Sequence, residues 1–278
     1  METAENQEKW QLILHHALRA CRLGREVLLN YYGNLGQVEA KFQAGLVSEA
    51  DKTSERVIQD YLLRHFPEYE FLGEEGAYQS GVKNLTPSKA GRWILDPLDG
   101  TTNYIHRFPI FCISLALEVD HEIKIAVIDV PLLNETYTAI KGVGAFLNGK
   151  KLEVSKTHEL KDAFLATGFV AEHEHVISEQ LQIFSEMVRK TRGIRRPGAA
   201  AYDLCLVAKG VFDGFWERNL QPWDSAAGIL LVREAGGVVK SYRGQDYHPY
   251  LNSCVAGNSH LVEAMRSIIQ KHVQQQTD

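Results

Sequence analysis

The sequence predicts a protein of mixed α and β structure, an α/β (α+β) chain, and three observations support this expectation. Residues 9–32 and 176–190 repeat apolar side chains at three- and four-residue steps, as amphipathic helices do. Residues 111–154 form apolar or alternating runs separated by turn residues, which is typical of antiparallel strands. After residue 163, short strands and helices alternate to the closing helix at 260–272. This order of helices and strands predicts the fold class but not the order of the layers.

Length and composition limit the class of protein further. The chain has 278 residues, which suffices for one large domain or two closely packed ones. With 45% hydrophobic and 23% charged residues it is not expected to be disordered. A formal net charge of −5 argues against a general nucleic-acid-binding surface. Residues 1–9 are polar and acidic, and no apolar run approaches the length of a membrane span, so we expect a soluble, cytoplasmic protein with no membrane partner.

The cysteines and histidines show no pattern typical of a metal site. The four cysteines are far apart in the sequence, and each lies in an apolar run, so we expect buried thiols. They are Cys21, Cys112, Cys205 and Cys254. His15 and His16 lie on or beside the apolar face of the first helix, and we expect them to be structural or exposed rather than ligands. His173 and His175 alternate in a polar loop without a third ligand, so zinc is not expected there.

The first third of the chain contains two acidic segments, each at the start or end of a predicted element. The helix at 9–32 ends at Gly33, and residues 41–47 form a polar loop. Residues 48–51 (Ser-Glu-Ala-Asp) resemble a capping box that begins a second helix, in which Asp51 would complement the helix dipole. A short strand at 69–72 then runs into residues 73–76 (Gly-Glu-Glu-Gly), which read as a solvated turn or a metal-binding corner. Residues 77–91 read as a surface loop.

The most informative stretch follows at residues 92–104. An apolar strand, Trp93 to Leu95, is followed by two carboxylates, Asp96 and Asp99, beside a proline and a glycine that constrain the turn. Converging carboxylates repel each other unless a cation or proton lies between them, and oxygen ligands suit Mg2+. A following Thr-Thr pair at 101–102 could begin a short helix whose free N–H groups face an anion. A simple β-turn is the alternative, which this stretch alone leaves open.

The rest of the chain supplies three more candidate segments. After a predicted meander with turns at Asp120-His121 and Asn148-Gly149, a strand at 163–169 carries Gly168 near its end. A strand at 193–196 enters the small residues 198–201, which permit close approach of a ligand or of another helix, here 202–209. Of the adjacent Arg195 and Arg196, at most one can reach a given site, because neighbouring strand residues face opposite ways.

The last candidate segments are a strand at 211–217, which ends at Glu217, and a helix at 226–234. Asp224 would be the N-cap or a first-turn residue of that helix. Strands at 236–239 and 253–256 precede the closing helix. Acidic groups thus lie at strand ends or helix starts in four segments, and such ends often converge on one cleft in α/β folds.

Three of these motifs, in their order and spacing, resemble those of the inositol monophosphatase family, the magnesium-dependent, lithium-sensitive sugar phosphatases. They are Gly73-Glu74-Glu75, Asp96-Pro97-Leu98-Asp99-Gly100-Thr101-Thr102-Asn103 and Trp223-Asp224-Ser225-Ala226-Ala227-Gly228. The resemblance runs from the first helix to the last. It implies a layered αβαβα sandwich, often a homodimer, and a single domain over 1–278 that can be divided into two subdomains, about 1–155 and 156–278.

The resemblance also implies roles for individual residues. Glu74, Asp96 and the carbonyl of Leu98 would hold a first Mg2+; Asp96, Asp99 and Asp224 would hold a second; and a third, weaker ion would rest on Glu74 through water. Asp51 and Thr101, with Glu74, would be the catalytic residues, the first two orienting and deprotonating the attacking water. The residues implied to bind substrate are Gly100, Thr101, Thr102, Gly168, Gly198, Ala199, Ala200, Glu217 and Asp224.

The expected reaction is hydrolysis of myo-inositol monophosphate by metal-activated water, with a small phosphate ester as the partner. Glu217 is placed to accept hydrogen bonds from vicinal hydroxyls, as in the inositol phosphatases. At Ala199, however, the family often has Ser or Thr, so one hydroxyl contact is absent. The alternatives are another ester, such as histidinol phosphate, fructose 1,6-bisphosphate or a nucleotide, and an accessory role in RNA-processing or transcription complexes. For that role the sequence offers only a small basic cluster, Arg192 with Arg195 and Arg196.

Overall fold

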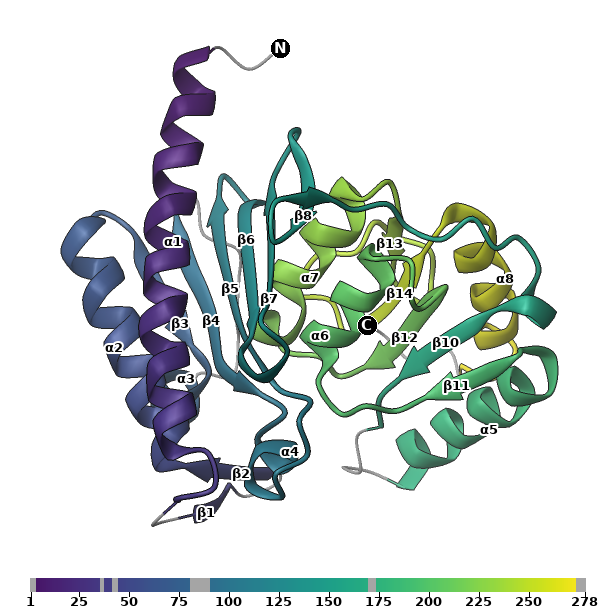
Figure 1. Ribbon diagram of the computed structural model, residues 1–278. Helices are drawn as coiled ribbons and strands as arrows, with labels where there is room; N and C mark the ends of the chain where they lie inside the picture. The colour runs from purple at the N-terminus through teal and green to yellow at the C-terminus, as the bar shows by residue number, and fades with distance from the viewer. Residues whose placement is uncertain (1–3, 36–37, 42–44, 81–90, 170–173, 274–278) are drawn as a thin grey trace.

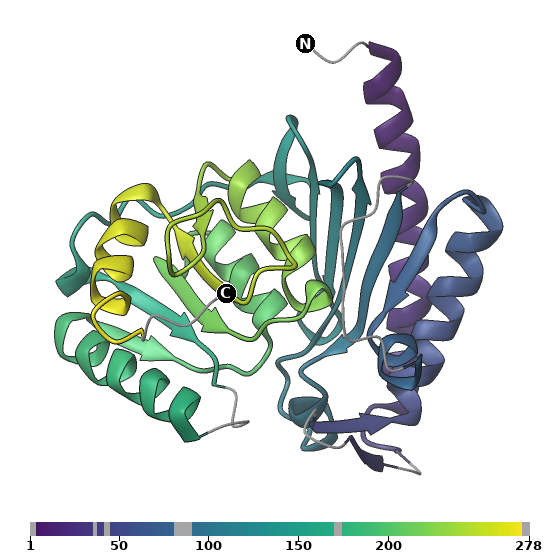
Figure 2. The ribbon, with the colours of Figure 1, turned by 180° about the vertical axis from the view of Figure 1, so that it is seen from behind.

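The computed structural model describes all residues except 1–3, 36–37, 42–44, 81–90, 170–173 and 274–278. It is a layered αβαβα sandwich, and the expected fold class is confirmed (Figure 1). The outer layer of α1 (Ala4–Tyr31) and α2 (Glu49–His65) covers one face of a seven-stranded sheet, and α6 (Ala200–Ala208) and α7 (Pro222–Glu234) cover the other. Beyond them lie a five-stranded sheet and a last layer, α5 (Glu174–Lys190) with α8 (Ser259–Ile269) (Figure 2).

The seven-stranded sheet follows chain order, so the predicted antiparallel meander is confirmed. Its strands are β3 (Glu70–Gly73), β4 (Arg92–Asp99), β5 (Cys112–Val119), β6 (Glu122–Val130), β7 (Glu135–Ile140), β8 (Gly144–Leu147) and β9 (Lys150–Lys151). Only β3 and β4 pair in parallel. The β5–β6 and β8–β9 hairpins turn where predicted, with positive φ at Asp120, His121, Asn148 and Gly149, as two-residue hairpin loops of this type require.

The five-stranded sheet has the order β11 (Gly193–Arg195), β10 (Phe164–Thr167), β12 (Gly214–Arg218), β14 (Ser253–Gly257) and β13 (Val238–Lys240). In it β10 pairs in parallel with β11 and β12, and β14 pairs antiparallel with its two neighbours. The strands of one sheet thus come from residues 70–151 and those of the other from 164–257. A division of the chain into subdomains stays a prediction.

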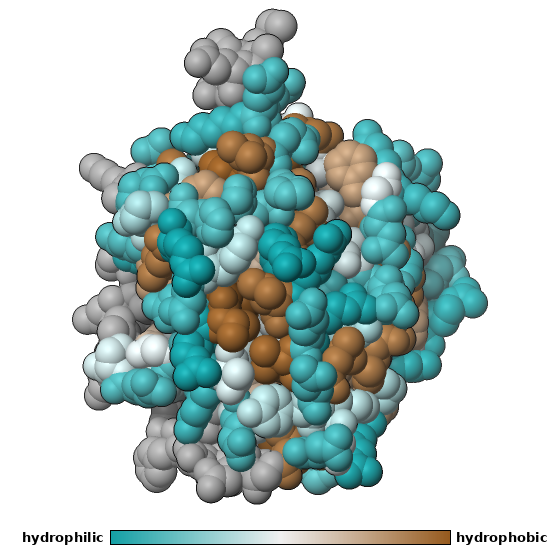
Figure 3. Space-filling model, turned by 60° about the vertical axis from the view of Figure 1, so that its left-hand side comes forward, coloured by the Kyte–Doolittle hydropathy of each residue, from teal (hydrophilic) through white to brown (hydrophobic). Residues whose placement is uncertain are grey.

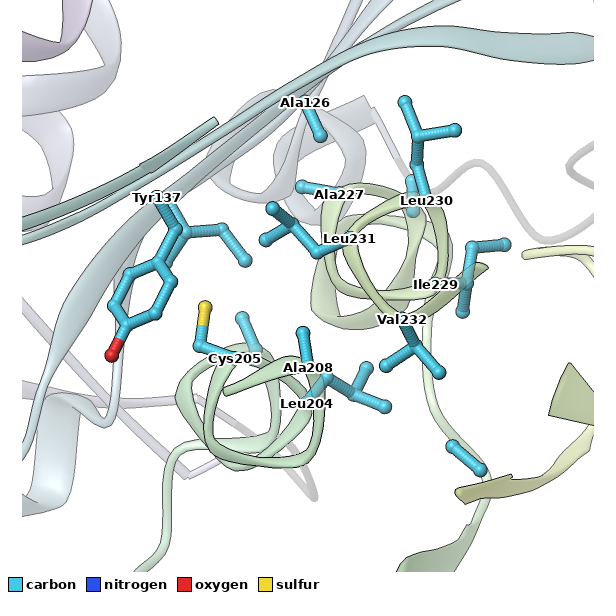
Figure 4. Close-up of a cluster of buried hydrophobic side chains, with 14 of the residues drawn as sticks. Ala126, Tyr137, Leu204, Cys205, Ala208, Ala227, Ile229, Leu230, Leu231 and Val232 are labelled. Carbon is cyan, nitrogen blue, oxygen red and sulfur yellow. The ribbon is translucent and has the colours of Figure 1, made fainter. Parts of the chain in front are cut away.

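The core follows from strand alternation and from two closely packed helices. In β4, Trp93 and Leu95 pack on the α1–α2 side and Ile94 on the other. Between the two sheets, apolar residues of α6 and α7 pack against the seven-stranded sheet, as Figure 4 shows around Tyr137 of β7. A β-carbon on Gly228 would lie 2.5 Å from Leu204 Cδ1, so the helices approach closely only because this residue is glycine.

All four cysteines are buried, as expected.

Viewed from the α1–α2 side, the surface is mostly hydrophilic with scattered hydrophobic groups (Figure 3). Among the helices of the described residues, none combines the length and the apolarity needed to cross a bilayer.

Two predictions for the first third of the chain were wrong. Part of the loop expected at 41–47 belongs to an antiparallel pair, β1 (Val38–Lys41) and β2 (Gly45–Ser48). Residues 73–76, for which a solvated turn was one of two interpretations, instead begin a helix, α3 (Glu74–Ser80). The carboxylate of Glu55 in α2 accepts hydrogen bonds from the backbone N–H groups of Glu75 (2.9 Å) and Gly76 (2.8 Å), which caps α3 at its start. The surface loop expected at 77–91 is helical at 77–80, and its residues 81–90 lie outside the described residues, as does His173.

Several boundaries also differ. Helix α7 begins at Pro222 rather than 226 because a proline suits the first helical position, and α6 begins at Ala200 rather than 202. Strand β12 begins at Gly214 rather than 211, and α8 ends at Ile269 rather than 272. Two short 3-10 helices, Pro131–Leu133 and Leu160–Asp162, complete the chain's elements together with α4 (Thr101–Ile105).

Candidate active site

Two carboxylates of the candidate site are placed by an irregularity in β4. Residues three apart in a regular strand face opposite sides of the sheet, so Asp96 and Asp99 would diverge. Here Asp96 is opposite Ser114 and Asp99 is opposite Cys112, so β4 contains one residue more than β5 between these pairs. Such a bulge redirects side chains, and the charge of Asp99 raises the pKa of Asp96 as well as that of Asp224. The strand end therefore directs both side chains toward one region.

Two further carboxylates reach this region from helix starts. Glu74 is the first residue of α3, and Asp224 lies in the first turn of α7, where its Oδ2 accepts a hydrogen bond from the backbone N–H of Gln221 at 2.7 Å. Asp224 is thus both a capping residue and a member of the acidic cluster. Asp96 is 3% exposed, whereas Glu74 and Asp224 remain partly exposed. The cluster therefore extends from the interior to the surface.

The effects of these carboxylates on one another's pKa values indicate that the four side chains lie near one another. Burial raises the pKa of Asp96 well above its ordinary value, and the charges of Glu74, Asp99 and Asp224 raise it further. Burial likewise raises the pKa of Asp99 to about 7, against the hydrogen bond of 2.8 Å that its Oδ2 accepts from the N–H of Ala201. Burial and then the charges of Asp99 and Glu74 raise the pKa of Asp224. A bound cation would relieve this repulsion.

The donor chemistry fits a hard divalent cation. The cluster offers only oxygen ligands, and the Leu98 carbonyl lies at the same strand end, between Asp96 and Asp99. Among the described residues no group of three or more His, Cys, Asp and Glu side chains is arranged so that it could hold a metal ion. The fit therefore rests on the kind of donors and on their mutual repulsion.

Asp51 and Thr101 are in direct contact, although fifty residues separate them. Thr101 Oγ1 lies 3.0 Å from Asp51 Oδ1 and 3.1 Å from the Leu98 carbonyl oxygen, and its one proton can be donated to either. The other carboxylate oxygen of Asp51 accepts hydrogen bonds from the N–H of Ser48 (2.8 Å) and from its hydroxyl (2.5 Å). Asp51 is thus the acid of the predicted capping box and a partner of Thr101 at once.

The start of α4 has the backbone geometry of an anion-binding turn. Gly100 has φ +92, and a β-carbon on it would lie 2.9 Å from the carbonyl oxygen of Ile110, so only glycine fits. The first N–H groups of any helix have no acceptor within it, which leaves those of Thr101 and Thr102 directed outward. Asn103 Nδ2 lies 2.8 Å from both the Ile110 and Pro197 carbonyl oxygens and joins α4 to the loop before α6.

The other predicted substrate-binding residues lie at or just beyond the ends of β10 and β12 and around the start of α6. A β-carbon on Gly168 would lie 2.0 Å from Glu217 Oε1, so the carboxylate lies directly against this glycine, and the two segments meet as predicted. Burial, followed by the charge of Asp99, raises the pKa of Glu217 to about 8. Gly198, with φ +88, leads into Ala199 and Ala200 at the start of α6.

Sequence reasoning missed Asp203 at this site. This α6 residue is 1% exposed, and its Oδ1 has no hydrogen-bond partner among the described residues. Burial raises its pKa well above the ordinary value, and the charges of Glu217 and Asp99 add to this. The available signal was one aspartate within the apolar stretch 199–208.

An αβαβα sandwich with carboxylates gathered at a strand end and two helix starts places the chain among the phosphatases. It belongs to the inositol monophosphatase family, whose sequence model matches residues 9–276. Enzymes of this family generally depend on a metal ion, Mg2+.

Three relatives illustrate the range of names in this family. The chain is 44% identical over 241 residues to the inositol-1-monophosphatase of Rhizobium meliloti (strain 1021), covering 85% of this chain and 87% of the relative. It is 37% identical over 273 residues to the fructose-1,6-bisphosphatase/inositol-1-monophosphatase of Aquifex aeolicus (97% and 98%). It is also 39% identical over 269 residues to the Nus factor SuhB of Pseudomonas aeruginosa (95% and 97%).

Solved structures agree with the fold. The extragenic suppressor protein suhB from Bartonella henselae superposes with a TM-score of 0.85 at 37% identity, over 94% of this chain and 100% of that one. The inositol monophosphatase from Anabaena (Nostoc) sp. PCC 7120 gives 0.81 at 32% identity, over 96% and 98%.

The raised pKa values predict how stability depends on pH without metal. The pKa of Asp99 is raised from 3.8 to about 7 and that of Glu217 from 4.5 to about 8. Between the unfolded and folded values the folded state binds more protons, so the free energy of unfolding falls as the pH rises. We expect a lower Tm at pH 8 than at pH 6 in EDTA, measured by calorimetry. Asp99→Asn should flatten this dependence; a Tm in EDTA that rises over the same range would contradict the assignment.

Proposed function

We propose that this chain is a Mg2+-dependent phosphomonoesterase that hydrolyses myo-inositol monophosphate to inositol and phosphate. The observation that supports this most is the gathering of Asp96, Asp99, Asp224 and Glu74 beside the hydrogen-bonded pair Asp51 and Thr101. Acidic oxygen ligands next to a residue pair able to handle a proton are the parts that ester hydrolysis requires.

The proposed metal ligands divide the acidic cluster into two sites. Glu74, Asp96 and the Leu98 carbonyl would hold one Mg2+; Asp96, Asp99 and Asp224 would hold another; and a third ion would rest on Glu74 through water. When bound, the ions supply positive charge that neutralises the carboxylates and stabilises negative charge on the phosphoryl oxygens. Asp96, the most buried of the four, is the shared ligand in this scheme.

The chain's own residues would position and deprotonate the attacking water. Asp51 accepts two hydrogen bonds from Ser48, which fix its carboxylate, while burial raises its pKa and makes it a stronger base. Thr101 would donate its proton to Asp51 Oδ1 and accept one from the water. The N–H groups of Gly100, Thr101 and Thr102 would hold the phosphate oxygens.

Substrate choice would depend on residues of the five-stranded sheet and of the segment that enters α6. Glu217, lying against Gly168, offers oxygens to vicinal hydroxyls, and Gly198, Ala199 and Ala200 leave room beside it. Because Ala199 has no hydroxyl, the pocket makes one contact fewer than a serine or threonine would provide. The Glu217 carboxylate supports a polyol substrate. The missing contact at Ala199 leaves glycerol 2-phosphate, nucleoside monophosphates and histidinol phosphate as competing substrates.

The Nus-factor names of relatives support a second candidate, an accessory role in a transcription complex. The small basic cluster gives this role limited support. Arg192 Nη2 forms an ion pair with Asp162 at 2.8 Å, and the Arg195 guanidinium lies over Phe164. Homodimer formation, lithium sensitivity and a cytoplasmic location stay predictions.

A substrate comparison tests the proposal. Phosphate release is measured with Mg2+ from myo-inositol 1-phosphate, histidinol phosphate, fructose 1,6-bisphosphate and p-nitrophenyl phosphate, which has no hydroxyls. We expect the highest kcat/KM for inositol 1-phosphate. Glu217→Gln should lower the ratio of kcat/KM for inositol 1-phosphate to that for p-nitrophenyl phosphate about tenfold, as expected for the loss of one hydrogen bond to the substrate. Equal losses on both esters would contradict the role of Glu217, and a preference for another ester would contradict the substrate.

A further inference from the structure

Glu55 of α2 lies against the segment that carries the first proposed metal ligand. The residue is 7% exposed. Its Oε2 accepts a hydrogen bond from the N–H of Glu75 at 2.9 Å, and its Oε1 accepts one from the N–H of Gly76 at 2.8 Å. These two residues directly follow Glu74, the proposed ligand and the first residue of α3. The carboxylate of Glu55 therefore holds the backbone next to Glu74 at two points.

The glycines on either side of the two glutamates leave room for this contact. A β-carbon on Gly73 would lie 2.4 Å from Glu55 Oε2, and one on Gly76 would lie 3.3 Å from Oε1. Any larger residue at position 73 would displace the carboxylate, because the interior is closely packed. The glycine before Glu74 is thus part of the same contact.

The same turn of α2 contacts two other segments of the candidate site. Asp51 lies four residues before Glu55, on the same side of the helix, and its Oδ1 is 3.0 Å from Thr101 Oγ1 in α4. Ser54 Oγ donates to the Pro97 carbonyl oxygen of β4 at 3.2 Å. One turn of α2 therefore bonds to the start of α3, the end of β4 and the start of α4.

We propose that Glu55 is a positioning residue for the proposed Mg2+ site, which acts by fixing the start of α3 and so the Glu74 carboxylate. The inference rests on the proposed metal-dependent function. Without this contact Glu74 would have to be ordered when the ion binds, and that ordering costs free energy. Residues that orient metal ligands without touching the ion typically change metal affinity about 10–100-fold.

A different explanation is that Glu55 only stabilises the fold. In that case its replacement would lower the Tm but would leave the Mg2+ affinity of the folded protein unchanged. Asp213 provides a comparison, because it is also buried, at 9% exposure, and its Oδ2 accepts a hydrogen bond from the N–H of Phe164 at 2.6 Å. Phe164 begins β10, at the opposite end of that strand from Gly168.

The experiment measures Mg2+ binding to the metal-free full chain by isothermal titration calorimetry, without substrate. Glu55→Asp keeps the charge but shortens the side chain, so that the carboxylate cannot reach both N–H groups. Glu55→Gln keeps the length but leaves one oxygen acceptor in place of two. Each variant should raise the dissociation constant for Mg2+ about tenfold. The matched control, Asp213→Asn, should stay within about twofold of wild type, because distant sites act independently.

Kinetics provide a second measurement on the same variants. Glu55 is not placed to touch the substrate, so KM at saturating Mg2+ should match that of wild type in both Glu55 variants. The rate that they lose at limiting Mg2+ should return when Mg2+ is in excess, because mass action compensates for the weaker affinity. A loss of kcat that excess Mg2+ does not restore would contradict a role through the metal ligand.

Three calorimetric results would overturn the inference and leave the phosphatase function intact. These are wild-type affinity in both Glu55 variants, wild-type affinity in Glu55→Asp alone, which would mean that charge is sufficient, and an equal loss of affinity in Asp213→Asn. A wild-type protein that binds Mg2+ but releases phosphate from no ester would contradict the proposed function alone, since the titration needs no substrate. A folded wild-type protein that binds no Mg2+ would overturn both.

Discussion

Asp99→Asn should reduce kcat for phosphate release about a thousandfold or more, because the cluster then loses one carboxylate ligand worth several kcal/mol to the transition state. The fold should survive. Asparagine keeps an oxygen that can accept the hydrogen bond from the Ala201 N–H, now at 2.8 Å. It also removes one charge from a cluster whose members raise each other's pKa, so the Tm in EDTA should equal or exceed that of wild type.

The matched control for this variant is Asp203→Asn. Asp203 is also a buried aspartate whose pKa is raised, by burial and by the charges of Glu217 and Asp99, but it lies outside the proposed ligand set. Both variants should gain stability in EDTA, whereas only Asp99→Asn should lose the rise in Tm that Mg2+ produces. An Asp99→Asn protein with wild-type kcat would contradict the proposed role of this residue.

Thr101→Ala should lower kcat about a hundredfold or more, with little change in KM, because it removes the link between Asp51 and the attacking water. The Thr101 hydroxyl contacts Asp51 Oδ1 at 3.0 Å, and within the described residues no other side chain donates a hydrogen bond to that oxygen. The measurement is the initial rate at saturating substrate and Mg2+, with substrate concentration varied to separate kcat from KM.

Thr101→Ser tests whether the hydroxyl is responsible. Serine keeps the donor and acceptor but lacks the methyl group, so most of the activity should return. If Thr101→Ser were as inactive as Thr101→Ala, the methyl group or local packing would explain the loss, and the proton-transfer role would be wrong.

Local signals were sufficient for the elements whose determinants are close in sequence. The capping box at Ser48, the β5–β6 turn at Asp120-His121 and the β8–β9 turn at Asn148-Gly149 were all predicted from a few residues. Helix α3 was missed because its cap is Glu55, twenty residues earlier in α2. The sequence around Glu74 carries no trace of that partner.

The site shows the same division between local and distant determinants. The motifs identified the acidic residues through a family resemblance, but nothing in residues 96–99 reveals the extra residue in β4, because a bulge is defined only against β5. Likewise, strand alternation indicated that the side chains of Arg195 and Arg196 would face opposite sides of the sheet. That Arg195 lies over Phe164 in β10 depends on a contact that only the fold creates.

The most direct test of the account is the rate of phosphate release from myo-inositol 1-phosphate by metal-free wild-type protein during titration with Mg2+. The acidic cluster predicts no release in EDTA and a saturable rise in rate as Mg2+ is added. Equal rates with and without Mg2+, or no release at any Mg2+ concentration from a folded protein, would contradict the claim that these carboxylates form a metal-dependent phosphatase site.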